Sequence, residues 1–147
     1  MKKFEFKLQA LLKIKEIEEK KKLAELAVVV NRYQKNVDQI NKFDVESNFL
    51  LQQESSRLRS EKTLDFQYMR GLSRYLDILR NRRNNAQKNL NEMATELSNK
   101  QKEVAGYRVR RRAIEILKEK QLEEHSQSIN RETISQLDEF NSRKRVV

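Results

Sequence analysis

Apolar side chains recur every three and four residues through most of this chain, which is the spacing of a helix that packs along one stripe. The longest regular series covers 46 residues without a slip, and eleven of its fourteen positions are apolar. Disorder does not sustain such a series, so the pattern predicts a long helix with a coiled-coil seam. The fourteen positions are Met69, Leu72, Leu76, Leu79, Arg83, Ala86, Leu90, Met93, Leu97, Lys100, Val104, Tyr107, Arg111 and Ile114.

A shorter series with the same spacing precedes it and predicts a first helix. Its positions are Leu23, Leu26, Val30, Tyr33, Val37 and Ile40. Phe43, Phe49, Leu50 and Leu51 follow off register. We therefore expect the seam to change near Asp44, which occupies the next position of the series.

Residues 52–63 form the clearest break between the two series. They hold three serines and only one strongly apolar residue, Leu58. Ser60, Thr63 or Asp65 can each cap the following helix, because their side-chain oxygens accept hydrogen bonds from its free N–H groups. The pattern leaves the choice among the three open.

Two helices joined by a short break are expected to fold back on each other. The fold class predicted is all-α, with two long helices forming an antiparallel coiled-coil hairpin, and the seven-residue repeat predicts a left-handed supercoil. We expect a single domain over 1–147, with helix one at about 7–55, a turn at about 56–63, helix two at about 64–140 and a frayed tail at 141–147.

One register matches the two seams and centres the turn on Glu61–Lys62. It pairs Leu26 with Leu97, Val30 with Met93, Tyr33 with Leu90 and Val37 with Ala86. It also places Asp44 one layer from Arg83, so these two polar seam residues are expected to be partners. A slip of one heptad stays open.

Composition supports a helical fold and excludes several others. Charged residues make up 37% of the chain and apolar residues 37%, with no proline, cysteine or tryptophan and only two glycines. A sheet-rich fold needs more turn residues than this. Phe4, Phe6 and Leu8 alternate as in a strand, but three positions are too few to predict one. The net charge of +10 favours acidic partners.

The chain lacks the residues that an active site or a resident cofactor needs. It has no cysteine, no glycine-rich phosphate loop and no Ser–His–Asp set, and a two-helix rod offers no dry pocket. We expect no enzyme, no cofactor, no metal and no small-molecule substrate. The single histidine, His125, is expected to be a solvated surface residue. No apolar run is long enough to span a membrane and no signal peptide is evident, so a cytoplasmic location is expected.

Two features are candidates for binding partners. Arg108, Arg110, Arg111 and Arg112 form a basic run, with Arg111 on the seam. The run can be a solvated face paired with Glu115 and Glu119, a contact for an acidic protein, or, less favoured, a nucleic-acid patch.

Aromatic residues gather near the turn at Phe43, Phe49, Phe66, Tyr68 and Tyr75. Tyr75, Ile78 and Arg82 fall outside the seam. They either cover its flank or form a partner surface.

The chain resembles the flagellar export protein family FliJ. The resemblance rests on the F-x-F-x-L-x-x-L-L start at Phe4–Leu12 and on the stretch Phe66–Leu79, which reads FQYMRGLSRYLDIL. It implies a non-enzymatic stalk that couples a hexameric cytoplasmic export ATPase to an integral-membrane export gate and that handles export chaperones. The implied location is the inner face of the cell membrane at the flagellar base, through partners, with no nucleic acid bound. An injectisome stalk or a generic coiled-coil scaffold is the alternative.

The resemblance also implies two contact surfaces. The export-gate contact would consist of Ile40, Phe43, Tyr75, Leu79, Arg82 and Ala86, of which Arg82 and Ala86 match the family pattern poorly. The ATPase contact would consist of Phe4, Phe6, Leu8, Leu11, Arg108, Arg110, Arg111 and Arg112.

Overall fold

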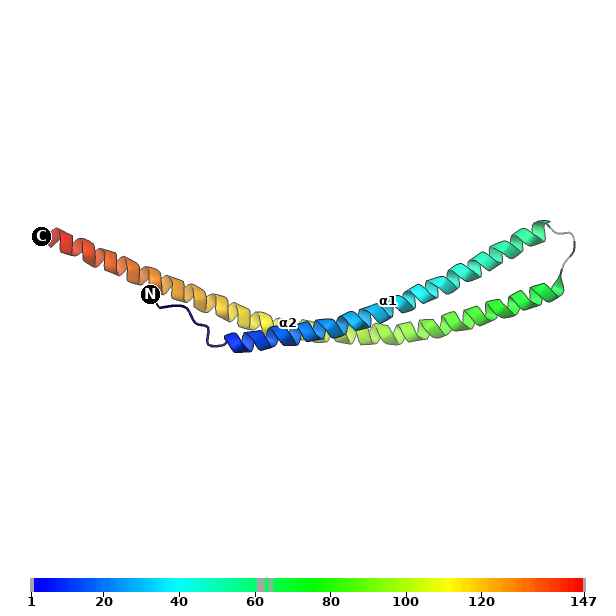
Figure 1. Cartoon of the computed structure of the whole chain (residues 1–147), viewed down its shortest axis with the longest axis horizontal. Helices are drawn as coiled ribbons and strands as arrows, with labels where there is room; N and C mark the ends of the chain where they lie inside the picture. The colour runs from blue at the N-terminus through cyan, green and yellow to red at the C-terminus, as the bar shows by residue number, and fades with distance from the viewer. Residues whose placement is uncertain (1, 61–62, 64, 147) are drawn as a thin grey trace. The chain divides into compact units, whose positions relative to one another are not determined.

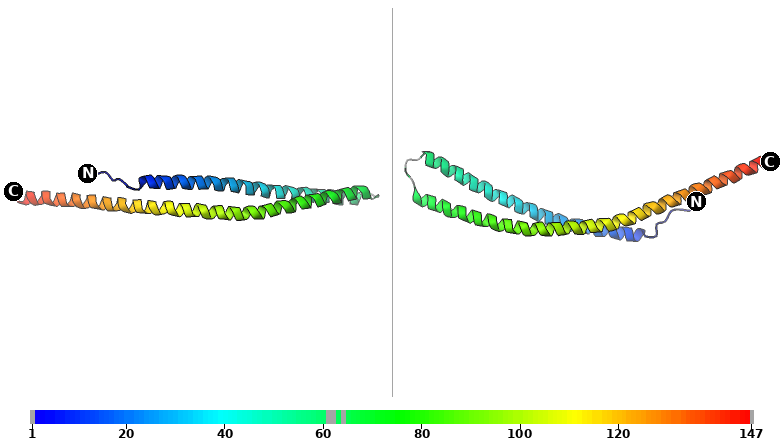
Figure 2. Two further views of the ribbon diagram at one scale, coloured as in Figure 1. Left: turned by 90° about the horizontal axis from the view of Figure 1, so that it is seen from below. Right: turned by 180° about the vertical axis from the view of Figure 1, so that it is seen from behind.

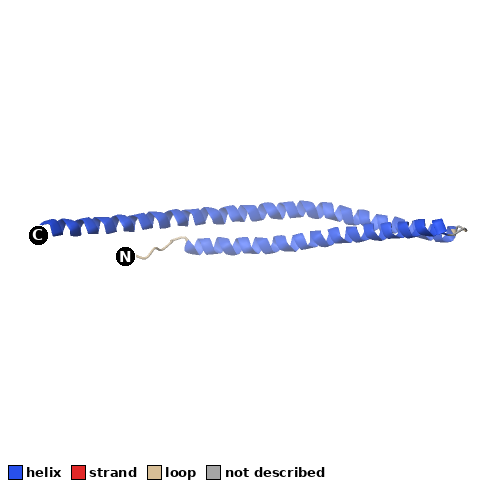
Figure 3. Ribbon diagram, turned by 90° about the horizontal axis from the view of Figure 1, so that it is seen from above, coloured by secondary structure: helices blue, strands red, loops and turns tan. Residues whose placement is uncertain are grey.

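Two helices account for nearly all of the computed structural model, which describes residues 2–60, 63 and 65–146. Helix α1 spans Gln9–Ser60 and helix α2 spans Phe66–Val146 (Figure 1). They pack against each other as an antiparallel hairpin, so the predicted fold class is confirmed. Figure 3 shows the segment before α1 as a loop. The predicted turn centre at Glu61–Lys62 lies outside the described residues.

Each helix begins two residues later and ends five or six residues later than the sequence pattern suggests. Residues 56–60, placed in the turn by the pattern, belong to α1, and residues 141–146, expected as a frayed tail, belong to α2. Asp65 provides the cap of α2. Its Oδ1 accepts hydrogen bonds from the backbone N–H groups of Gln67 at 3.1 Å and Tyr68 at 3.2 Å. These bonds satisfy two of the four free donors at the helix start.

The contacts divide the chain into two units. Unit 1 combines Met1–Leu23 with Glu103–Val147, and unit 2 is Ala24–Lys102. In both views of Figure 2 the two helices of unit 2 lie side by side. Each unit is built from both helices, and the interpretation of the chain as one domain stays a prediction.

The seam of α2 is the predicted one. All fourteen positions between Met69 and Ile114 are buried or half-buried, and Leu79, with 1% of its surface exposed, is the most buried large side chain. Each turn of α2 therefore places one seam side chain against α1. This burial of apolar surface supplies the main driving force for pairing the helices.

The seam of α1 differs from the predicted one. Leu26, Tyr33 and Ile40 are correct, but the intervening positions are shifted by one residue. The seam is Glu19, Lys22, Leu26, Val29, Tyr33, Asn36, Ile40, Phe43, Ser47, Leu50, Glu54 and Arg57. Leu23 and Val30 are exposed instead, at 38% and 44%.

This seam also continues past Asp44 without a change, so the predicted change there is wrong. The physical reason is that the row of Val30 and Val37 reaches Asp44 in the next heptad. Burying a carboxylate costs more than burying the amide of Asn36. The observed row brings Phe43 and Leu50 into the seam and leaves Asp44 at its edge.

A buried amide fixes the register of unit 2. Asn36 Nδ2 donates a hydrogen bond to the backbone carbonyl of Ala86 at 3.0 Å. Asp44 accepts from Arg83 Nε at 2.5 Å, as predicted from the sequence. Both contacts exclude the one-heptad slip, but the α1 seam holds Val29 and Asn36 in place of Val30 and Val37, so the predicted pairs of these two valines are not seam pairs. A single buried polar residue commonly selects one register in this way.

Candidate functional surfaces

Three of the six residues expected at the export-gate contact are core residues. Leu79, Ile40 and Ala86 are 1%, 6% and 7% exposed and lie in the seam of unit 2. A partner cannot reach these side chains while the helices stay paired. Their assignment to a contact surface is therefore corrected. The heptad spacing itself carried the signal, because all three are on the predicted seams.

The other three expected gate residues reach the surface to different degrees. Phe43 is half-buried in the seam, whereas Arg82 and Tyr75 are exposed beside it. The Tyr75 hydroxyl donates a hydrogen bond to the Glu46 carboxylate of α1. This bond raises the pKa of Tyr75 above its usual value, because the carboxylate stabilises the protonated phenol.

Exposed apolar residues adjoin Tyr75 on both helices. Val45 and Phe49 on α1 are 68% and 62% exposed, and Ile78 on α2 is 47% exposed. Val45 and Phe49 are one helical turn apart and line a shallow surface hollow together with Glu46 and Lys42. We call Val45, Phe49, Tyr75 and Ile78 the aromatic edge. From the sequence, Phe49 is one of the aromatic residues near the turn and is not assigned to a contact.

The N-terminal segment of unit 1 packs against α2. Phe6 is 8% exposed, and its carbonyl accepts a hydrogen bond from the N–H of Gln9 at 3.0 Å. The Phe4 ring lies 5.5 Å from the ring of His125, centroid to centroid. The segment is a loop, so the alternating apolar residues do not make a strand.

His125 is half-buried rather than a solvated surface residue as expected. Its Nε2 lies 3.2 Å from the carbonyl oxygen of Lys2, and Phe4 covers its ring. The N-terminal segment thus explains the placement of this histidine. Sequence reasoning missed it because helix periodicity carries no information about a loop that returns onto a distant helix turn.

The arginine run of α2 is largely neutralised within unit 1. Arg111 and Arg108 both donate to the carboxylate of Glu19 on α1, Arg108 at 3.3 Å. Arg111 also pairs with Glu115, and Arg112 pairs with Glu115 and Glu119 at 3.1 Å each. The local pairing expected with Glu115 and Glu119 is therefore confirmed.

Glu19 is the partner that sequence reasoning missed. Only 9% of its side chain is exposed, because it occupies a seam position of α1 and faces Arg108 and Arg111 of α2. Its two arginine partners compensate the cost of burying the carboxylate. The sequence does contain a signal for this pair, because Glu19 is an acidic residue in the seam of α1 and Arg111 is a basic residue in the seam of α2.

The charge network shifts the ionisation of its members. Hydrogen bonds from Arg111 and Arg112 lower the pKa of Glu115 below 4.5. The hydrogen bonds that Arg111 donates to Glu115 and Glu19 raise its pKa, and those that Arg112 donates to Glu115 and Glu119 raise the pKa of Arg112. Arg110 lies with its guanidinium carbon 5.3 Å from the centre of the Tyr107 ring. Four closely spaced arginines consequently present less free charge than the sequence suggests.

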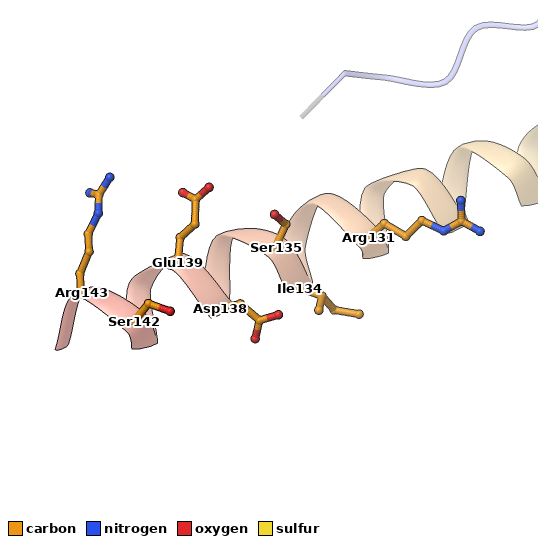
Figure 4. Close-up of a pocket in the computed structure, with 7 residues that line it drawn as sticks. All are labelled: Arg131, Ile134, Ser135, Asp138, Glu139, Ser142 and Arg143. Atoms are coloured by element: carbon orange, nitrogen blue, oxygen red, sulfur yellow. The ribbon is translucent and has the colours of Figure 1, made fainter. Parts of the chain in front are cut away.

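The C-terminal part of α2 has an exposed apolar face. Every residue from 131 to 146 is exposed, and Ile134, Leu137 and Phe140 are 58%, 55% and 56% exposed. Figure 4 shows residues around a hollow on this part, with side chains such as Arg131 and Asp138 coming from a single helix. One helix cannot enclose a ligand, so this hollow is open helix surface rather than an enclosed small-molecule site.

The described residues offer no arrangement for metal binding or membrane crossing. Over residues 2–60, 63 and 65–146, no three His, Asp or Glu side chains converge as metal ligands. Neither helix, within the same part of the chain, contains a stretch long and apolar enough to traverse a bilayer.

Comparison with known proteins gives one match. The model of the family described as "Flagellar FliJ protein" matches residues 4–145. No curated protein and no solved structure matches the chain. The match begins at Phe4, in the N-terminal segment, and ends at Arg145, near the end of α2.

Proposed function

The chain belongs to the FliJ family of flagellar export proteins, and from this premise we propose that it is a non-catalytic stalk between an export ATPase and an export gate. The observation that carries the proposal is the hairpin itself. Each of its two units exposes large apolar side chains, while the seam residues are buried where α1 packs against α2. Such a protein acts by binding larger partners rather than by chemistry of its own.

Unit 1 is the proposed contact for the hexameric ATPase. Leu8 and Leu11 of the expected set are each 38% exposed, and the exposed face of Ile134, Leu137 and Phe140 extends the surface. Arg110 adds positive charge, whereas Arg108 and Arg111 hold Glu19 and Arg112 pairs with Glu115 and Glu119. Phe4 and Phe6 fix the N-terminal segment on α2 and act as positioning residues for this contact.

Unit 2 is the proposed contact for the membrane-embedded gate subunit and for export chaperones. The aromatic edge supplies exposed apolar surface, and Arg82 and the rim of Phe43 adjoin it. Large aromatic side chains with a polar tip, such as Tyr75, are common anchors of protein interfaces. Leu79, Ile40 and Ala86 support this surface from the seam. Gate binding would place the chain at the inner face of the membrane without any segment of its own crossing it.

Binding experiments with purified partners test the two contacts separately. Leu137→Lys plus Phe140→Lys should weaken binding to the export ATPase and leave binding to the cytoplasmic domain of the gate subunit unchanged. Phe49→Ala plus Tyr75→Ala should do the reverse. Both pairs alter exposed residues, so circular dichroism should show unchanged helix content. Gate binding that survives the second pair would contradict the proposed gate contact.

A further inference from the structure

The two edges that flank the seam of unit 2 differ sharply in chemistry. One edge, which we call the neutral edge, carries aliphatic, aromatic, small and amide side chains with one acid and one base. It consists of Val30, Val37, Asp44, Leu51 and Leu58 on α1 and Phe66, Ser73, Arg80, Gln87 and Ala94 on α2. The opposite edge carries the charged residues Glu25, Arg32, Glu46, Arg82 and Glu96 among its members. Tyr75, which belongs to the aromatic edge, lies on this same side of the seam, one heptad before Arg82.

The neutral edge is apolar but not covered by the hairpin. Val30, Leu51, Leu58 and Phe66 are 44%, 53%, 39% and 65% exposed. On α1 these positions directly follow the second seam position of each heptad, so Val30, Val37, Leu51 and Leu58 add a third, mainly apolar row beside the two rows of the seam. A stripe of this width is typical of a helix in a bundle, whereas a two-helix coiled coil needs only two rows.

Charge favours a second copy of the same chain at this edge. The chain has a net charge of +10, so two copies repel each other over most of their surface. At the neutral edge the charged groups are already paired, Asp44 with Arg83 at 2.5 Å and Arg80 with Asp77 at 3.9 Å. This edge can meet its own copy without unbalanced charge.

The arrangement of side chains on the edge is also self-complementary. Val30 and Leu58 lie equally far from Asp44 along α1, and so do Val37 and Leu51. A two-fold axis at Asp44 brings Val30 of one copy to Leu58 of the other and Val37 to Leu51. It also brings the bulky end of the edge, with Phe66, to the small end, with Ala94. At the axis, two Asp44–Arg83 pairs meet and can exchange partners.

We propose that unit 2 forms a symmetric antiparallel dimer through its neutral edge, giving a four-helix arrangement of two hairpins. Residues 30–58 extend for about 42 Å at about 1.5 Å per residue, and two helices are about 20 Å wide. The footprint of about 800 Å² per copy equals that of a standard specific interface. The aromatic edge stays free on both copies.

The oligomeric state of the full chain tests this dimer. Sedimentation equilibrium should give a mass of about twice 17.7 kDa at high protein concentration, with the dimer fraction rising with salt as the repulsion is screened. Val30→Lys plus Leu51→Lys should return the mass to that of the monomer. Val28→Lys plus Val45→Lys is the matched control, because these residues are 55% and 68% exposed, lie off the neutral edge and add the same charge. The control should remain a dimer.

Disulfide cross-linking tests the antiparallel arrangement, since the chain has no cysteine of its own. A mixture of Val37→Cys and Leu51→Cys chains should form a covalent heterodimer on oxidation, and each chain alone should not. A monomeric wild type at every concentration, a control that becomes monomeric, or cross-linking of each single variant with itself would overturn the proposal.

Discussion

The same two helices pair in different ways in the two units. In unit 2 the seam is mainly apolar, with Val29, Ile40 and Leu79 among its most buried members. In unit 1 the buried Leu12 and Val104 alternate with a charged cluster in which Glu19 holds Arg108 and Arg111. Apolar burial is not weakened by screening salt or by protonation, whereas ion pairs are weakened by salt and by acid. We therefore expect unit 2 to be the more stable part of the hairpin and unit 1 to open more readily when the solution conditions change.

The largest effect is expected from Leu79→Ala in unit 2. The side chain is 1% exposed, so its truncation removes buried apolar surface and leaves a cavity. We expect the free energy of unfolding to fall by about 2–5 kcal/mol, measured by urea denaturation followed by circular dichroism. Ile78→Ala, at the neighbouring exposed position, is the control and should have a much smaller effect. Equal losses in both variants would show that Leu79 is not a core residue.

A smaller and local effect is expected from Glu19→Ala in unit 1. Loss of the carboxylate leaves Arg108 without its interhelical partner and removes one of the two acids that hold Arg111. Hydrogen exchange measured by mass spectrometry should rise in residues 9–23 and 103–118 and stay unchanged in unit 2. Glu119→Ala, which removes the same charge from an exposed pair, is the control. If high salt leaves the difference between wild type and Glu19→Ala intact, the ion pairs are not its cause.

Acid should loosen unit 1 before unit 2. The pKa of Glu115 is lowered in the folded chain from its ordinary value of 4.5. Its contribution to stability is therefore complete above pH 4.5 and is lost as the pH falls through the lowered folded value. Hydrogen exchange at a series of pH values, corrected for the intrinsic rate, should show this order. Simultaneous loosening of both units would contradict the contrast between them.

The smallest effect is expected from the two helix-interior glycines, one in each unit. No atom outside the local helix lies within 4 Å of a side chain built at Gly106 or Gly71. Gly106→Ala and Gly71→Ala should therefore each stabilise the chain by about 0.5–1 kcal/mol, measured by thermal unfolding. A destabilised Gly106→Ala chain would mean that unit 1 needs a close approach at this position.

Helix identity and antiparallel pairing were predictable because they depend on a periodic signal. The seam of α2 and the Asp44–Arg83 pair follow from heptad spacing alone. The seam of α1 was not predictable in full, because two adjacent rows compete there, one with Val29 and Phe43 and one with Val30 and Val37. The sequence offers three candidates for the N-terminal cap of α2, namely Ser60, Thr63 and Asp65. In the structure Asp65 is the capping residue.

The candidate surfaces were less predictable, since contact residues carry no periodic signal. Leu79 and Ile40 were assigned to a partner surface by family resemblance although their heptad positions place them in the core. The pairing of Arg111 with Glu19 depends on two segments 92 residues apart. The placement of Phe4 on His125 depends on a loop, and no sequence pattern fixes where a loop packs.

The most direct test of the central claim is a bridging experiment with purified components. The cytoplasmic domain of the gate subunit is immobilised, and retention of the export ATPase is measured with and without this chain. The account predicts that the ATPase is retained only when the chain is present, and that Phe49→Ala plus Tyr75→Ala or Leu137→Lys plus Phe140→Lys each abolishes retention. Equal retention of the ATPase without the chain, or with both pairs of substitutions combined, would contradict the claim that this hairpin links the two.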